Sequence, residues 1–150
     1  GNPRPVAIYL LSTYCVMADL YYALAATGYE SELINQKQIR KRLRLLHIRI
    51  LVFSTSAPIG MPLRYLSAGR RLILKGRTDR ARKILEKGVY SGESLRIPYL
   101  VAMLKVELAG IAENDTTRDT LLADASETFQ QLGITHPEVL SLRPVRPKDA

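Results

Sequence analysis

The chain has 150 residues, of which 47% are hydrophobic and 24% are charged, and its formal net charge is +8. These values are ordinary for a globular protein, and the length suffices to bury one core. The single cysteine, Cys15, excludes an internal disulfide, so we expect a buried, inert thiol and a reducing, cytoplasmic compartment.

Basic and acidic residues are distributed unevenly along the chain. Residues 1–90 contain 16 basic and 5 acidic side chains, whereas residues 91–150 contain 6 basic and 9 acidic ones. One end of the domain is therefore expected to attract anions, and the other end is not.

The first element in chain order is an apolar run over residues 6–28, which is long enough to span a bilayer. Asp19 lies inside this run, and a central carboxylate is costly in lipid. Several alanines in the run suit close packing between helices. We therefore expect a buried helix of a soluble protein, ending at Gly28, and no transmembrane span.

A helical period continues into the second element. The apolar residues Ile39, Leu43, Leu46, Ile50 and Phe53 step by four and three positions, which places them on one helix face. The only strand-like patch, RILVFSTSA, continues the same period. The sequence therefore predicts helices throughout.

Glycine and proline residues separate the remaining helices. Pro62 fits the first turn of a helix, Gly76 fits a C-terminal cap, and Gly133 ends the last helix. The predicted helices cover residues 6–27, 30–53, 62–75, 78–90, 95–112 and 118–132, with turns at 91–94 and 113–117. They form three antiparallel hairpins over 6–53, 62–90 and 95–132, within one domain over 1–133 that is followed by a proline-rich tail at 134–150.

Two short helices follow each other closely in the middle hairpin. Gly69 in the first and Ala81 in the second are small, so we expect these helices to cross at the two positions. Leu72 and Leu85 would then fill the space beside the crossing. The pattern that begins with Tyr65 in the first helix of this hairpin recurs from Tyr99, 34 residues later.

This pattern resembles the tetratricopeptide repeat, a helix–turn–helix unit of 34 residues. Residues 65–98 match the repeat well, and the first and last hairpins match it loosely. The resemblance implies an all-α fold in which about six helices stack as a short right-handed solenoid. The residues that carry the repeat are Tyr65, Gly69, Ala81, Leu85, Tyr99, Ala125 and Phe129.

A narrower resemblance is carried by residues 98–133. The segment from Pro98-Tyr99 to Gly133, with Arg118, Ala125 and Phe129, is similar to degenerate helical repeats in large ATPase-coupled signalling proteins. These include soluble-type adenylyl cyclases and ATPase-coupled kinases. The resemblance implies a regulatory part of such a protein, with any catalytic activity in a domain outside this chain.

No motif for catalysis, cofactor binding or metal binding stands out. The glycines of GRRLILKGR lack the spacing of a phosphate-binding loop. His47 and His136 are 89 residues apart and have no cysteine pair nearby. We expect His47 to be a surface residue, and we predict that the chain is no enzyme and holds no cofactor or metal.

The chemical feature that stands out is a basic segment, KQIRKRLRLLHIR. At helical spacing Lys37, Arg40, Lys41 and Arg44 share one face, and a second basic block contains Arg70 and Arg71. These six residues are the candidate anion- or partner-binding residues, and the alternative is a solvated face with no ligand. The apolar residues Leu45, Ile48 and Val52 widen the apolar side of the same segment, which suggests burial on two sides.

Two functions remain open at this stage. The first is a non-catalytic interaction or regulatory module, whose partner is a protein or a neighbouring domain of the same polypeptide. The second is a nucleic-acid-binding or ribonucleoprotein-associated subunit that uses the basic half to bind an acidic partner or RNA. Three hairpins are few for a repeat array, so a homo-oligomer is also considered.

Overall fold

The structure is a computed structural model that describes residues 5–31 and 35–134. Within these ranges it contains six α-helices and no β-strand, which confirms the all-α prediction. The proline-rich tail lies outside the described residues. The helices are α1 (Pro5–Thr27), α2 (Gln36–Ser56), α3 (Met61–Ile73), α4 (Thr78–Ser94), α5 (Pro98–Gly110) and α6 (Asp115–Gln131), with a short 3-10 helix, η1 (Pro58–Gly60), before α3.

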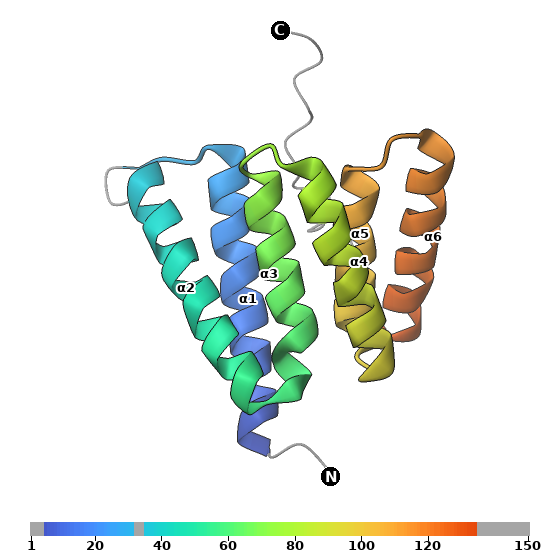
Figure 1. Ribbon diagram of the computed structural model, residues 1–150, viewed down its shortest axis with the longest axis horizontal. Coiled ribbons are helices and arrows are strands. Elements are labelled where there is room, and N and C mark those ends of the chain that lie inside the picture. Colours follow the sequence, from blue (N-terminus) through green and yellow to red (C-terminus); the bar gives the residue numbers. More distant parts are fainter. Residues whose placement is uncertain (1–4, 32–34, 135–150) are drawn as a thin grey trace, which may run out of the picture.

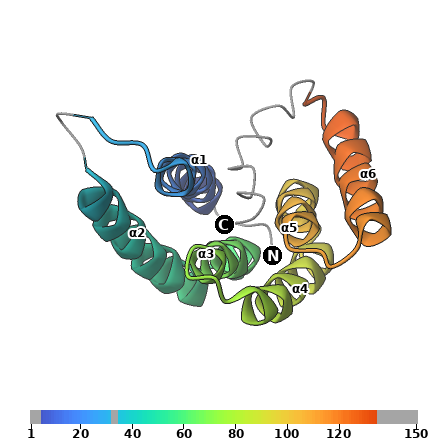
Figure 2. The ribbon, with the colours of Figure 1, turned by 90° about the horizontal axis from the view of Figure 1, so that it is seen from above.

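The helices form two layers in an arc. Successive helices run in opposite directions (Figure 1), with α1, α3 and α5 on the inner side of the arc and α2, α4 and α6 on the outer side (Figure 2). Each inner helix packs on the outer helix that follows it in the chain, and α3 and α5 also pack on the preceding outer helix. The inner layer therefore joins the three pairs into one body.

Helix boundaries follow local chemistry at several points. Gly76 has a φ of +69°, a left-handed conformation that favours glycine, and it ends the turn after α3. Helix α2 begins later than predicted because Asn35 forms a capping box with Gln38. Helix α6 begins earlier than predicted, since the Asn114 side chain accepts a 2.8 Å hydrogen bond from the Thr117 amide.

The prediction of a turn at residues 91–94 is wrong, because α4 continues to Ser94. Gly92 is buried, and a Cβ atom added there would lie 2.7 Å from Cγ2 of Val101 in α5. The glycine thus lets α4 and α5 approach closely. Close packing between the two helices outweighs the low helix propensity of glycine at this site.

The centre of the core lies between α3, α4 and α5. Gly69 is buried, and the three atoms nearest to a Cβ added there all belong to Leu85. The small residue in α3 therefore packs against Leu85, rather than against Ala81 as the sequence suggested. Ala81 is fully buried in the same core. Gly88 plays a similar part, since a Cβ there would contact Leu104.

The last pair of helices is joined by an aromatic contact. The rings of Tyr99 in α5 and Phe129 in α6 meet edge to face, with centroids 6.1 Å apart. Ala125 is buried one turn before Phe129, so α6 lies close to α5. These three repeat-pattern residues therefore lie at one helix–helix contact.

Helix α1 is covered on one side only. The residues of α1 that face the core, among them Leu11, Cys15 and Ala18, are buried. A second stripe of the same helix, which includes Tyr9, Val16 and Leu20, is exposed to solvent. The expectation of a buried helix therefore holds for the inward face alone. By length and composition the stretch Val6–Thr27 is a candidate membrane span, and 17% of its most apolar window is buried.

Candidate anion- and partner-binding surface

Four of the predicted basic residues lie together on the outer layer. Lys37, Arg40, Lys41 and Arg44 are all exposed on the first half of α2. No ion pair joins them to an acidic side chain within residues 5–31 and 35–134. The first turn of α2 also contains no acidic residue, so the partial positive charge of the helix start adds to the side-chain charges.

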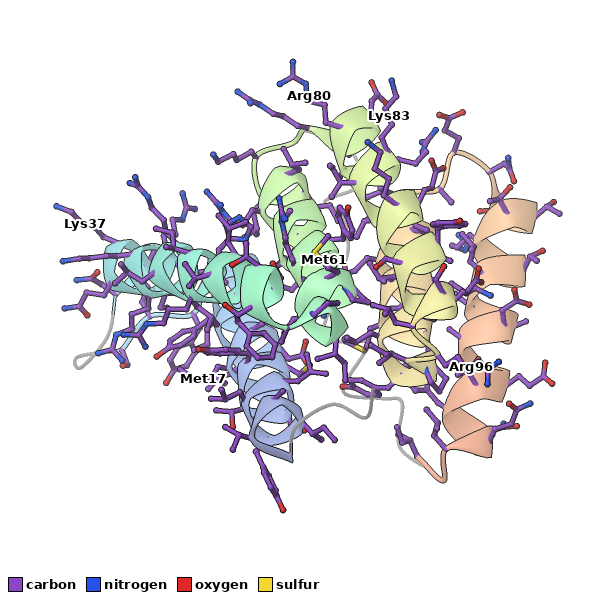
Figure 3. The ribbon with its side chains drawn as sticks, turned by 60° about the horizontal axis from the view of Figure 1, so that its bottom comes forward. Met17, Lys37, Met61, Arg80, Lys83 and Arg96 are labelled. Atoms are coloured by element: carbon purple, nitrogen blue, oxygen red, sulfur yellow. The ribbon has the colours of Figure 1, made fainter. Side chains whose placement is uncertain are left out.

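The basic residues of α4 lie at the same end of the molecule, where α2 and α4 both begin (Figure 1). Figure 3 shows Lys37 projecting from the start of α2, and Arg80 and Lys83 projecting from the first turns of α4. The structure therefore places the cations at the start of α2 and those at the start of α4, which are far apart in the sequence, at the same end of the outer layer. This end has the geometry to attract an anionic partner.

Several acidic side chains in α6 and in the turn before it are paired with basic ones. Glu113 accepts a hydrogen bond of 2.6 Å from Arg82, and Asp124 accepts one of 3.0 Å from Lys105. Asp115 lies 2.8 Å from Arg118. These acidic side chains are thus paired, Glu113 with a cation of residues 1–90, whereas Lys37, Arg40, Lys41 and Arg44 of α2 form no ion pair within the described ranges.

Arg70 does not belong to this surface, which corrects its assignment as an anion-binding residue. It is 4% exposed and lies between the inner helices. Its Nη1 donates to Asp19 of α1 at 2.5 Å, and its Nε donates to Glu107 of α5 at 3.1 Å. The guanidinium also lies 4.8 Å from the ring centroid of Tyr22.

The buried ion cluster, defined by Arg70, Asp19 and Glu107, joins all three inner helices. Burial by itself would lower the pKa of Arg70, but Glu107 and Asp19 raise it above its usual value. The guanidinium is therefore held in its charged form and is paired with two carboxylates. Its role is to fix α1, α3 and α5 relative to one another, not to bind an external anion.

Arg71 is half-buried at the contact between α2 and α3, close to His47. His47 is not a simple surface residue, as the sequence suggested, because its Nδ1 lies 3.0 Å from the Ser67 hydroxyl and the ring is half-buried. Burial, Arg71 and Arg64 lower the pKa of His47 to about 4. The imidazole is therefore neutral at physiological pH.

The Cys15 thiol is buried in α1, as predicted. Burial and the nearby Asp19 carboxylate raise the pKa of Cys15 to about 12. Burial likewise raises the pKa of Tyr99 to about 12. Both side chains are therefore protonated near neutral pH.

The outward face of α2 is apolar in its second half. Leu45, Ile48 and Val52 are all exposed, so the prediction that α2 is buried on two sides is wrong. These residues continue the stripe of Lys41 at steps of four, three and four positions. One exposed helix face therefore presents cations first and apolar side chains afterwards, a combination typical of a protein-binding surface.

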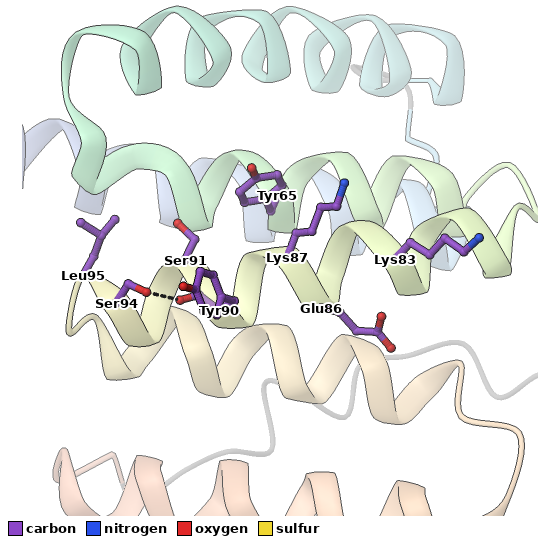
Figure 4. A pocket seen from close by; sticks show the side chains of 8 residues that line it. All are labelled: Tyr65, Lys83, Glu86, Lys87, Tyr90, Ser91, Ser94 and Leu95. Carbon is purple, nitrogen blue, oxygen red and sulfur yellow. Dashed lines mark hydrogen bonds between the residues drawn. The ribbon is translucent and has the colours of Figure 1, made fainter.

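A groove of about 750 Å³ lies on the outer side of α4, with Tyr65 of α3 beneath it (Figure 4). Sequence reasoning assigned Tyr65 only to the repeat pattern and did not single out Lys87 or Tyr90. The available signal was the spacing of Lys83, Lys87 and Tyr90, which places them on one face of α4. The groove is lined by Tyr65, Lys83, Glu86, Lys87, Tyr90, Ser91, Ser94 and Leu95.

The described residues contain no group of three or more His, Cys, Asp or Glu side chains that could hold a metal ion. The surface combines cations and apolar side chains with the carboxylate of Glu86 and the hydroxyls of Ser91 and Ser94 in the groove. No family model matches the chain, and neither a curated protein nor a solved structure is found to match it.

Proposed function

We propose that this chain is a non-catalytic interaction module whose helix pairs stack as a short, right-handed, tetratricopeptide-like solenoid. The observation that carries the proposal is the outer layer, where α2 and α4 expose apolar side chains next to cations, such as Lys41 and Lys87, that form no ion pair within the described ranges. The free energy falls when a partner covers the apolar part of such a surface and removes it from water. Its cations favour partners that carry negative charge.

The chain would act as a regulatory part of a larger intracellular signalling protein. The resemblance to repeats of ATPase-coupled signalling proteins supports this part of the proposal. Pro98 begins α5, and Ala125 and Phe129 are buried where α6 packs on α5, so the residues behind the resemblance lie at helix starts and helix contacts. The partner would be another protein or a neighbouring domain of the same polypeptide.

Selection from a displayed library of random peptides tests the proposal. The purified chain should enrich peptides with a shared pattern, and the enriched peptides should bind saturably with one site per chain in isothermal titration calorimetry. A scrambled copy of each peptide is the matched control. Failure to enrich any peptide that binds more tightly than its scrambled copy would contradict an interaction module.

The second candidate function is nucleic-acid binding by the first half of α2. It is favoured by the four exposed cations of α2, since phosphate contacts by Lys and Arg dominate such binding. The test is a titration with single-stranded RNA at two salt concentrations. Absent binding at low salt, or an affinity that does not change with salt, would exclude this function.

A matched pair of variants locates the RNA contact. Arg44→Gln removes a cation from the basic half of α2, whereas Arg96→Gln removes an exposed cation from the turn between α4 and α5. RNA binding through α2 predicts a weaker affinity and a smaller salt dependence for Arg44→Gln only. Equal losses for the two variants would indicate a general effect of net charge.

A further inference from the structure

We propose that the groove beside α4 binds an acidic peptide segment of a partner protein, with its carboxylates on Lys83 and Lys87 and an apolar side chain on Tyr90. This inference rests on the proposed interaction function and assigns a place and a chemistry to it. The groove lies on the outer layer, apart from the buried ion cluster of the inner helices.

The length and direction of the site follow from helix geometry. Lys83, Lys87, Tyr90 and Ser94 are separated by four, three and four residues and therefore form one stripe along α4. At a rise of about 1.5 Å per residue the stripe is about 16 Å long. A peptide of two to three helical turns, or a shorter extended segment, would cover it.

The charge in the groove is positive at the start of the stripe. Lys83 and Lys87 are exposed, and no ion pair within the described ranges occupies them. Glu86 also lines the groove, but Figure 4 shows that it leaves α4 on the side opposite to Lys87, which rises toward Tyr65. Two carboxylates of a ligand, one helical turn apart, would pair with the two lysines.

The other end of the groove is apolar. Tyr90 is 76% exposed, Leu95 is exposed, and Tyr65 is half-buried at the floor. The Ser94 hydroxyl donates to the Tyr90 carbonyl at 2.9 Å, so this donor is already used. An exposed tyrosine over an apolar floor is a typical anchor for a partner side chain. The two ends of the site are therefore complementary to a ligand that is acidic in one part and apolar in the other.

This chemistry favours a peptide over RNA. Among the described residues no arginine lines the groove, and the planar fork of arginine is the preferred contact for phosphate. A single largely exposed aromatic ring also offers little base stacking. A phosphate backbone is charged at every nucleotide, so it would place charge against Tyr90 and Leu95. A peptide can place an apolar side chain there instead.

Three labelled peptides test the ligand chemistry by fluorescence anisotropy. The first combines a run of glutamates with a leucine–phenylalanine pair, the second replaces the glutamates with glutamines, and the third replaces the apolar pair with glutamates. We expect the first to bind most tightly, and to weaken as salt rises. Equal affinity for the first two peptides, or for the first and the third, would overturn the proposal.

Matched variants of the chain test the place. Lys87→Glu and Lys75→Glu make the same change in net charge at exposed lysines, but only Lys87 lines the groove. Tyr90→Ser and Tyr9→Ser remove tyrosines that are 76% and 74% exposed. We expect Lys87→Glu and Tyr90→Ser each to weaken binding about tenfold, the loss of a substantial interface contact, and the two controls to leave it unchanged.

Several outcomes separate the explanations. If Lys75→Glu weakens binding as much as Lys87→Glu, only net charge matters and the groove is not the site. If polyuridylate displaces the acidic peptide and loses affinity with the Lys87→Glu variant, the groove is a nucleic-acid site and the proposal is wrong. If library peptides bind but the acidic peptides do not, the groove inference fails while the interaction function stands.

Discussion

Helices α1 and α5 lie in the same inner layer and are apolar around most of their circumference, yet they are buried to very different extents. Nine of the 13 residues of α5 are buried. In α1, by contrast, only 17% of the most apolar window is buried. Helix α5 is enclosed by α3, α4 and α6, whereas α1 packs on α2 and α3 and lies at one end of the arc (Figure 2).

The difference shows that the apolar sequence of a helix predicts that burial would be favourable, but does not identify the helix that buries it. Outward residues of α1, such as Val16 and Leu20, remain exposed because no helix in the described ranges covers that side. The equivalent side of α5 packs on α4, where Gly88 and Gly92 allow close approach. Helix α1 should therefore be the more weakly held of the two inner helices.

The largest expected effect comes from the residue that links the two helices. Arg70→Met removes the cation between Asp19 of α1 and Glu107 of α5, so the buried Glu107 and the partly buried Asp19 lose the cation that they share. We expect the free energy of unfolding to fall by about 3–5 kcal/mol. Urea unfolding followed by circular dichroism measures it.

The triple variant Arg70→Met, Asp19→Asn, Glu107→Gln is the control for this loss. It removes the carboxylate charges together with the cation, so it should recover part of the stability. If Arg70→Met alone changes the free energy of unfolding by less than about 0.5 kcal/mol, the cluster does not join α1 to α5.

The next prediction compares leucines on the two helices. Leu104 of α5 is fully buried, whereas Leu20 of α1 is 56% exposed. Leu104→Ala should cost about 2–5 kcal/mol through lost burial and a cavity. Leu20→Ala should cost no more than about 0.5 kcal/mol. Paired unfolding curves test both values.

A large loss of unfolding free energy in Leu20→Ala would contradict the difference in burial between α1 and α5. It would mean that the outward face of α1 is covered in solution, for example by a second copy of the chain. Light scattering at two protein concentrations would identify such a homo-oligomer, because its stability depends on concentration.

A smaller effect is expected in the middle hairpin, between the two helices compared above. A Cβ atom at Gly69 would lie 2.4 Å from Cδ2 and 2.6 Å from Cγ of the fully buried Leu85. Helix propensity favours Gly69→Ala by about 1 kcal/mol, but overpacking typically costs about 1–3 kcal/mol. We therefore expect a neutral or lower melting temperature, and Gly69→Leu should be worse.

The exposed variant Lys41→Ala is the contrast for Gly69→Ala, and it should change stability by no more than about 0.5 kcal/mol. A melting temperature that rises for Gly69→Ala would show that α3 and α4 are less closely packed than the structure indicates. The helices α3 and α4 would then be packed no more closely than α1 and α2.

The smallest effect concerns pH and the attachment of α2 to α3. The pKa of His47 is lowered to about 4, so the unfolded chain binds a proton more readily than the folded one between about pH 6.5 and 4. Stability should therefore fall as pH drops through this window. The effect is modest, because the ring is half-buried and its charge is partly screened by solvent.

His47→Asn keeps a polar group near the Ser67 hydroxyl but does not titrate. Unfolding midpoints measured from pH 7 to pH 4 should fall more steeply in the natural chain than in this variant. Identical pH dependence in both chains would show that His47 is not desolvated at the contact between α2 and α3.

Much of the helical frame was predictable from local signals. The steps of four and three residues from Ile39 to Phe53 identified α2, and Gly28 and Gly76 marked helix ends where the backbone is left-handed. The local signals failed where packing decides. At residues 91–94 the glycine suggested a turn, but contact with Val101 keeps α4 helical through this stretch.

The candidate surface was predictable only in part. Its exposed cations on α2 follow from helical spacing, but the sequence cannot tell an exposed arginine from a buried one. Arg70 and Arg71 are adjacent in the chain, and a rotation of about 100° between successive residues points one into the inner layer and the other toward α2. The groove was missed because its floor, Tyr65, comes from a different helix.

The sequence by itself determined the helical class, the number of α-helices within the described ranges and the uneven charge, since these depend on residue spacing and composition. The tertiary structure decided that Arg70 is buried, that α1 is half exposed and that a cationic groove lies beside α4. The physical reason is that burial and electrostatic environment depend on which side chains of distant segments surround a residue. Local periodicity places a residue on a face, but only the packed neighbours determine what that face meets.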